Sequence, residues 1–119
     1  LVNGGEGPSG KRILKPETIA WATEVRTKEH HRVPILDYPV NRALTVVVAG
    51  DDGNMHLRGF GRTCSPRAFG HGGAGGQIGW CDPATGISLG YCTEGFLDEI
   101  QQGRRITAIS SLAAQCAAG

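Results

Sequence analysis

A glycine-rich stretch with a single histidine, AFGHGGAGGQIGW, covers residues 68–80 and contains the best candidates for a reactive site. A strand edge of small residues leaves backbone N–H groups clear, and such groups stabilise an oxyanion when held about 3 Å from the developing charge. His71 is the polar ring at this edge. The stretch therefore predicts one wall of an acyl-transfer site. The alternative is that the glycines only permit close packing and His71 is an ordinary strand histidine.

A nucleotide site is the first competing interpretation of these glycines. Gly70, Gly72 and Gly75 formally match G-x-G-x-x-G. That motif needs a helix N-terminus after the glycines to hold a pyrophosphate, whereas QIGWCDPATG is typical of a strand followed by a tight turn. A phosphate-binding P-loop is excluded as well, because no Lys-Ser/Thr pair follows the glycines.

The cysteines give no metal or disulfide pattern. They are widely and irregularly spaced, without a C-x-x-C pair, at Cys64, Cys81, Cys92 and Cys116. We expect reduced thiols. A zinc site shared with the four histidines is the less favoured alternative, since no pair has ligand spacing on a predictable element. The sequence predicts neither a metal nor another cofactor.

The length of 119 residues indicates one domain, with 39% hydrophobic residues for a modest core. Twelve Lys and Arg balance eleven Asp and Glu, so no nucleic-acid partner is expected. The apolar run 43–49 is too short to cross a bilayer, and we expect no membrane partner and a cytoplasmic location. The chain begins at Leu1 and its one methionine is Met55, which leads us to expect that the true N-terminus is missing.

Local patterns predict an α+β fold, an antiparallel sheet flanked by helices. Residues 1–13 are expected to form a loop, and a short helix begins at Pro16 with Ile19, Ala22 and Val25 on one face. After a connecting loop over 27–39, a buried strand is expected from Ala43, and a glycine-rich turn suggests that it pairs with 55–61 as a hairpin.

The C-terminal half carries the stronger patterns. AFGHG is a predicted short strand, and QIGWC and GISLGYC flank the turn DPATG as a hairpin. Pairing about that turn sets Cys81 opposite Ser88 and Cys92 near Gln77, too far apart for a disulfide. A closing amphipathic helix follows, with a sheet-facing side of Ile106, Ile109, Ala113 and Cys116.

The segment FGHGGAGGQIGWCDPATGISLGYCTEG resembles the C-terminal strands of the serine β-lactamase-like family, in particular its class C β-lactamase and carboxylesterase group. NGGEGPSGKRILKPETIA resembles the segment that precedes them. The resemblance implies the C-terminal part of a β-lactamase/penicillin-binding-protein-like fold. Residues 1–119 would then be the C-terminal segment of one such domain, with the nucleophile-bearing part absent.

The resemblance also assigns roles at one site. His71-Gly72-Gly73 matches the family's third active-site element, His-x-Gly, on the strand that borders the pocket. By this resemblance His71 hydrogen-bonds or polarises the substrate, and the N–H of Ala74 supplies one donor of the oxyanion hole. Gly72 and Gly73 contact the substrate and keep the strand edge clear.

The family's other two elements have no counterpart here. The nucleophile motif Ser-x-x-Lys is absent, and Tyr38 and Asn41 are one residue too far apart for Tyr-x-Asn. We therefore expect a part of a serine hydrolase, an esterase or β-lactamase-like enzyme that works through an acyl-enzyme and is inactive as this chain alone. Its partners would be the rest of the gene product, or a companion chain with Ser-x-x-Lys, and a small acyl substrate. The alternative is a non-catalytic binding or oligomerisation module derived from that fold.

Overall fold

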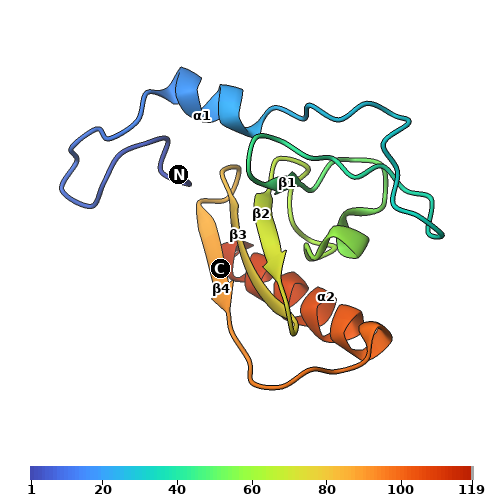
Figure 1. The fold of residues 1–119 in the computed structure, drawn as a ribbon. Helices are drawn as coiled ribbons and strands as arrows, with labels where there is room; N and C mark the ends of the chain where they lie inside the picture. Colours follow the sequence, from blue (N-terminus) through green and yellow to red (C-terminus); the bar gives the residue numbers. More distant parts are fainter. Residues whose placement is uncertain (119) are drawn as a thin grey trace.

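Within residues 1–118, which the computed structural model describes, four antiparallel strands form one sheet in the order β1-β2-β3-β4. They are β1 (Val47–Val48), β2 (Phe69–Gly73), β3 (Gln77–Asp82) and β4 (Ile87–Tyr91). The helices are α1 (Pro16–Thr23) and α2 (Glu99–Gln115), with short 3-10 helices η1 (Met55–Arg58) and η2 (Cys116–Ala118). Figure 1 shows α2 along the sheet and α1 beyond the end nearest β1, so the predicted α+β class is confirmed.

The β3–β4 hairpin has the predicted register. Cys81 pairs with Ser88 across it. Gly86 closes the turn with a φ of +77°, a conformation that favours glycine, and its N–H donates to Asp82 O at 2.8 Å. All four cysteines are free thiols, as expected.

The strand predicted from Ala43 is shorter than expected and has a different neighbour. Ala43 N–H donates to Val46 O at 2.9 Å, so the β-branched run first turns back on itself, and only Val47–Val48 extends as β1. This strand pairs with β2 and not with residues 55–61. The predicted hairpin is therefore wrong.

Residues 55–58 form the 3-10 helix η1, and an ion pair explains why. Asp52 accepts from Arg58, six residues later, through both carboxylate oxygens at 2.7 and 2.6 Å. Gly59 then ends the turn with a φ of +91°. Closing this ion pair winds the segment up, so it cannot extend as a strand.

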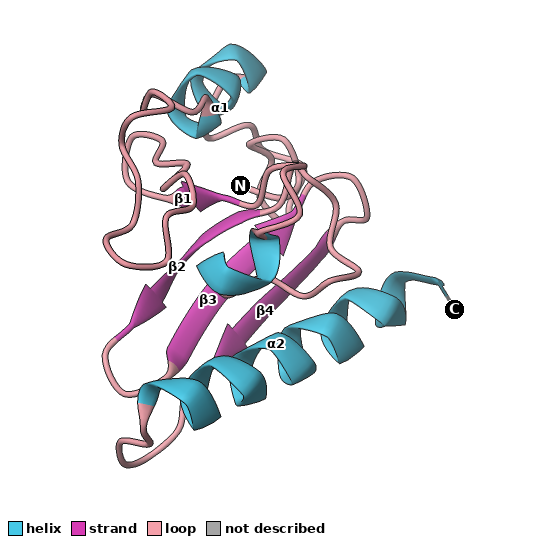
Figure 2. Cartoon of the chain, turned by 90° about the vertical axis from the view of Figure 1, so that its right-hand side faces the viewer, coloured by secondary structure: helices cyan, strands magenta, loops and turns pink. Residues whose placement is uncertain are grey.

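Helix α2 covers one face of the sheet, as Figure 2 shows. Asp98 caps its N-terminus by accepting from the N–H groups of Ile100 and Gln101. Its buried positions are Ile106, Ser110 and Ala114, spaced four residues apart, against a core that includes Ile78 and Trp80. The predicted face is correct at Ile106, whereas Cys116 is exposed because the α-helix ends at Gln115 and η2 follows.

A buried hydroxyl and a bare glycine fix the distance between α2 and the loop after η1. Ser110 Oγ accepts from Trp80 Nε1 at 3.0 Å and donates to Gly59 O at 3.1 Å, which satisfies a polar group in the core. A Cβ atom on Gly61 would lie 2.4 Å from the Ser111 nitrogen. Only glycine therefore permits this contact.

Helix α1 starts at Pro16 as predicted but ends at Thr23 and buries no residue. Val25 lies beyond its end, and the Trp21 ring meets the Arg26 guanidinium, whose central carbon is 4.7 Å from the ring centroid. Within the described part of the chain, no helix is long and apolar enough to cross a membrane.

Candidate functional site

The outer edge of β2 is the candidate site. Ala49 N–H donates to Ala68 O at 2.8 Å, which fixes the side of β2 that faces β1. Because backbone groups alternate along an extended strand, Gly70 and Gly72 direct their N–H and C=O groups to the same side. The β1 pairing ends at Gly70, so in the described residues no strand faces the edge from His71 to Gly73.

His71 lies on this edge with both ring nitrogens engaged. Nδ1 is 2.5 Å from Gly72 O, and Nε2 is 3.1 Å from Nη1 of Arg42. A carbonyl can only accept and a guanidinium can only donate, so these contacts assign the neutral tautomer with the proton on Nδ1. The ring thus holds Arg42 beside the strand edge.

A hollow of about 250 Å³ borders this edge. Its polar groups are His71, Arg42 and Arg58, together with the Gly72 backbone. The remaining wall is apolar or aromatic and comes from Val33, Tyr38, Val40, Val47 and Leu57. The hollow thus combines an apolar wall with a few polar groups, a combination typical of small-molecule sites.

Arg58, one of the residues that line the hollow, is the centre of a buried clamp. The Arg58 side chain is 1% exposed and donates to Pro39 O and Ala49 O as well as to the Asp52 carboxylate. Hydrogen bonding to Arg58 holds the pKa of Asp52 well below its ordinary value of 3.8. The guanidinium also lies over the Tyr38 ring, 5.5 Å from its centroid. The clamp thus ties Tyr38 to the sheet.

The glycines of this segment divide into two groups. A Cβ atom on Gly70 would lie 2.2 Å from Gly79 O, so the absence of a side chain at Gly70 allows β3 to pack against β2. Gly75 and Gly76 have φ values of +76° and +84° and form the β2–β3 turn. Gly72 is different, because the nearest atom to its Cβ position is Gln77 O at 3.9 Å. Strand packing alone does not require glycine there, and its small size clears the free edge.

Ala74, the second predicted catalytic position, lies just past the end of β2 in the turn and is exposed. It follows Gly72 by two residues, which is the spacing at which an extended strand would direct a second N–H to the same side. Within the strand itself, Gly72 is the residue whose N–H faces the hollow.

No nucleophilic side chain of the described residues hydrogen-bonds to His71, although the free thiol of Cys92 lines a further hollow together with His71. The hydrogen bonds of His71 involve Arg42 and Gly72, and no hydroxyl or thiol in residues 1–118 joins them. In the same range no three His, Cys, Asp or Glu side chains gather as a metal site. β3 follows the glycines where a dinucleotide site would need a helix. The arrangement can bind and polarise, and it lacks a group that could be acylated by the Ser-x-x-Lys chemistry.

Comparison with known proteins adds no relative: no protein-family model matches the sequence, and no curated protein matches it.

Arg42 is the site residue that sequence reasoning missed. It stands 29 residues before His71, in a segment without helical or strand periodicity. The arginine reaches the edge because Arg42 forms an antiparallel bridge with Val47, the first residue of β1. No pattern within the sequence connects the two positions, so only the fold could reveal the contact.

Proposed function

We propose that this chain is the C-terminal segment of a serine hydrolase related to class C β-lactamases and carboxylesterases. Residues 1–119 would form one wall of its active site. The observation that carries the proposal is the free, side-chain-poor edge of β2 at His71-Gly72-Gly73, beside a hollow of about 250 Å³. A C-terminal helix on an antiparallel sheet is compatible with that fold.

The nucleophilic serine and its lysine come, in this proposal, from the rest of the gene product or from a companion chain. The serine Oγ attacks the ester carbonyl carbon while the lysine takes the hydroxyl proton, and the carbonyl oxygen becomes an oxyanion. Collapse of this intermediate expels the alcohol, which receives that proton, and leaves an acyl-serine. Water then hydrolyses the acyl-serine, releases the carboxylic acid and restores the serine.

This chain would supply the donors. The N–H of Gly72, or of Ala74 once the turn adjusts, would stabilise the oxyanion at the free edge. His71 would act through its contact with Arg42, because its Nε2 accepts from that guanidinium and its Nδ1 proton is bound to Gly72 O. Arg42 would then present its remaining N–H groups to the substrate.

The first test is the composition of the protein as produced. Intact mass on a denaturing column, with peptide mapping, asks whether a second polypeptide with Ser-x-x-Lys accompanies the 12.5 kDa chain. Its presence supports the proposal. Hydrolysis of p-nitrophenyl butyrate by the mixture should then be lost in His71→Ala and kept in the control His31→Ala, an exposed histidine outside the hollow. Normal turnover by His71→Ala would sink the assigned role.

A non-catalytic module is the second candidate, and the β4 edge favours it. Among the described residues, β4 pairs with β3 alone. Its sequence ISLGY contains no Lys, Arg or Pro of the kind that protects a sheet edge from further pairing. A single 12.5 kDa species that forms concentration-dependent oligomers in light scattering, and that binds no acyl substrate, would favour this function.

A further inference from the structure

A second, larger groove lies between η1 and the first half of α2. It encloses about 610 Å³, which is within the usual range of roughly 300–1,000 Å³ for small-molecule sites. Its lining residues come from three separate segments and are Leu36, His56, Leu57, Arg62, Glu99, Ile100, Gly103, Arg104, Thr107 and Ala108. Leu57 alone also lines the hollow at His71. The groove is therefore next to the proposed hydrolase wall and shares Leu57 with it.

Large apolar side chains converge on this groove. Leu36, Leu57 and Ile100 are 62%, 43% and 69% exposed, although they come from a loop, η1 and α2. Single exposed apolar residues are ordinary on a protein surface, but a concave cluster of them is typical of a binding site. An apolar ligand that covered all three would remove much of this surface from water.

Strained backbone holds Leu36 at the groove. Its neighbours Ile35 and Asp37 have φ values of +70° and +50°, and the positive φ of a β-branched residue such as Ile35 is a genuine outlier. The ion pair between Arg32 Nε and Asp37 Oδ1, at 2.6 Å, closes this loop. Strain of this kind persists where the surrounding structure enforces it, often at ligand-binding positions.

The polar rim of the groove is mainly cationic. Arg62 and Arg104 are exposed and take no part in the ion pairs of the described residues, which engage other arginines. Glu99 is the acidic residue of the lining. Burial, and then the charge of Arg62, lower the pKa of His56, so its ring adds no positive charge at neutral pH. The lining therefore carries two guanidinium groups and one carboxylate.

We infer that this groove binds a medium-chain fatty carboxylate. The alkyl chain would lie on Leu36, Leu57 and Ile100, and the carboxylate would receive hydrogen bonds from Arg62 and Arg104. Arg presents a planar fork of donors that matches a carboxylate. The two turns of α2 from Ile100 to Ala108 span about 12 Å, a length that suits a medium alkyl chain.

Titration of the full 119-residue chain with decanoate, followed by amide shifts in ¹⁵N NMR spectra, tests the apolar wall. Ile100→Glu should weaken binding at least tenfold. The new carboxylate would repel the carboxylate of decanoate and would replace an apolar side chain that contacts its alkyl chain. The matched control is Leu112→Glu, since Leu112 is 65% exposed on the same helix and lies outside the groove. Equal affinity in the two variants would overturn the inference.

Substitutions in the polar rim test the contact with the carboxylate head group. Arg104→Gln should reduce decanoate affinity severalfold, whereas Arg67→Gln, which changes an exposed arginine elsewhere, should not. Decanol and acetate should each bind much more weakly than decanoate, and octanoate should lose roughly twofold to fourfold per methylene removed. Acetate bound as tightly as decanoate, or an unchanged Arg104→Gln variant, would contradict the proposal.

These measurements need no ester turnover, so they are independent of the proposed hydrolase. Ile100 and Arg104 are exposed, and circular dichroism should confirm that both variants keep α2. Failure to bind decanoate would overturn the proposal for the groove and would not bear on the proposed role of the His71 edge. Failure of hydrolysis would contradict the hydrolase proposal and would not bear on carboxylate binding in the groove.

Discussion

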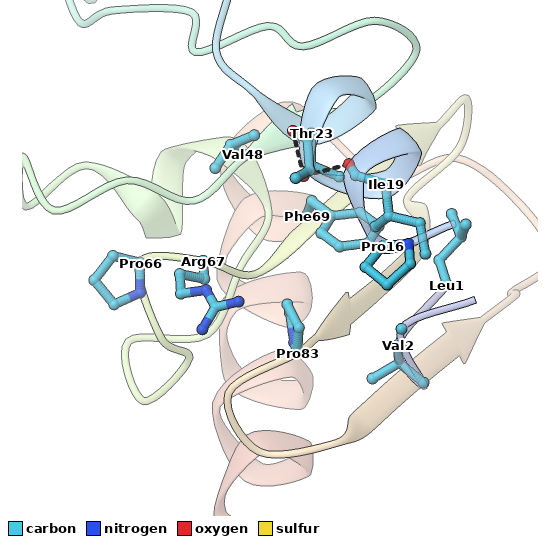
Figure 3. Close-up of a pocket in the computed structure, with 12 residues that line it drawn as sticks. Leu1, Val2, Pro16, Ile19, Thr23, Val48, Pro66, Arg67, Phe69 and Pro83 are labelled. Carbon is cyan, nitrogen blue, oxygen red and sulfur yellow. Dashed lines mark hydrogen bonds between the residues drawn. The ribbon is translucent and has the colours of Figure 1, made fainter. Parts of the chain in front are cut away.

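Helices α1 and α2 differ both in their N-terminal caps and in what they contact. α2 has a side-chain cap at Asp98 and buries three residues on the sheet, whereas α1 has no side-chain cap and buries none. Beneath α1, a hollow of about 610 Å³ remains between Ile19 and sheet residues such as Phe69, as Figure 3 shows. Helix propensity alone is a weak source of stability, so the difference indicates that stability resides in the sheet and α2.

The two tryptophans offer the largest test of this comparison. Trp80 is 3% exposed in the core, and Trp80→Ala should cost about 3–5 kcal/mol of unfolding free energy through the cavity it leaves. Trp21 is 53% exposed on α1, and Trp21→Ala should change the free energy by about 0.5 kcal/mol or less. Urea denaturation followed by far-UV circular dichroism measures both. Similar losses would mean that α1 is part of the cooperative core.

A substitution in the Arg58 clamp tests whether the segment between α1 and β2 unfolds together with the sheet. Asp52→Asn leaves a buried guanidinium without its carboxylate and should cost about 2 kcal/mol at neutral pH, below the full value for a buried pair because Asp52 is partly exposed.

The pH dependence has a definite sign, because the pKa of Asp52 is depressed in the folded state. The stabilisation is complete above the ordinary value of 3.8 and is lost as the pH falls toward the folded pKa. Urea midpoints of wild type and Asp52→Asn should therefore converge in acid. A constant difference across that range would contradict the role of the ion pair.

The N-cap of α2 provides a smaller effect on the stable side of the comparison. Asp98→Ala removes the acceptor for two N–H groups and should cost about 1 kcal/mol. Lys15 occupies the equivalent position before α1 and makes no side-chain cap, so Lys15→Ala should leave the thermal midpoint unchanged. Calorimetry distinguishes the two variants, and a larger loss in Lys15→Ala would reverse our assignment.

His56 gives the smallest expected effect. Burial lowers its pKa below the ordinary value of 6.5, so the unfolded chain binds more protons there than the folded chain. Stability should be complete above pH 6.5 and should decline as the pH falls from that value toward the folded pKa. In His56→Gln the decline between pH 7.5 and 5.5 should be smaller, as measured by urea midpoints. An equal decline would assign it to other groups.

Sequence patterns were most informative where local chemistry agrees with the final contacts. The turn DPATG, the register of Cys81 with Ser88 and the start of α1 at Pro16 depend on residues close in the chain, and they were predicted. The hairpin from Ala43 was not, because η1 forms through an ion pair between Asp52 and Arg58 that overrides the alternation of apolar residues.

The candidate site shows the same division. The strand with His71 and the absence of a helix after the glycines follow from residues 68–82, and both are observed. The contact of Arg42 with His71 depends on where β1 ends, and the burial of Ser110 depends on Trp80 and Gly59 across the sheet. Such long-range contacts have no periodic signal in one sequence.

The contacts of Arg58 determine how residues 39–58, which form part of the wall of the hollow at His71, can open. The Arg58 guanidinium joins Pro39, Ala49 and Asp52, so separating any of them from the others would expose a buried cation with lost hydrogen bonds. Residues 39–58 should therefore open in one step, as a single cooperative unit of hydrogen exchange. Arg42 lies within that unit, so the contact between Arg42 and His71 at the strand edge should be lost whenever the Arg58 clamp opens.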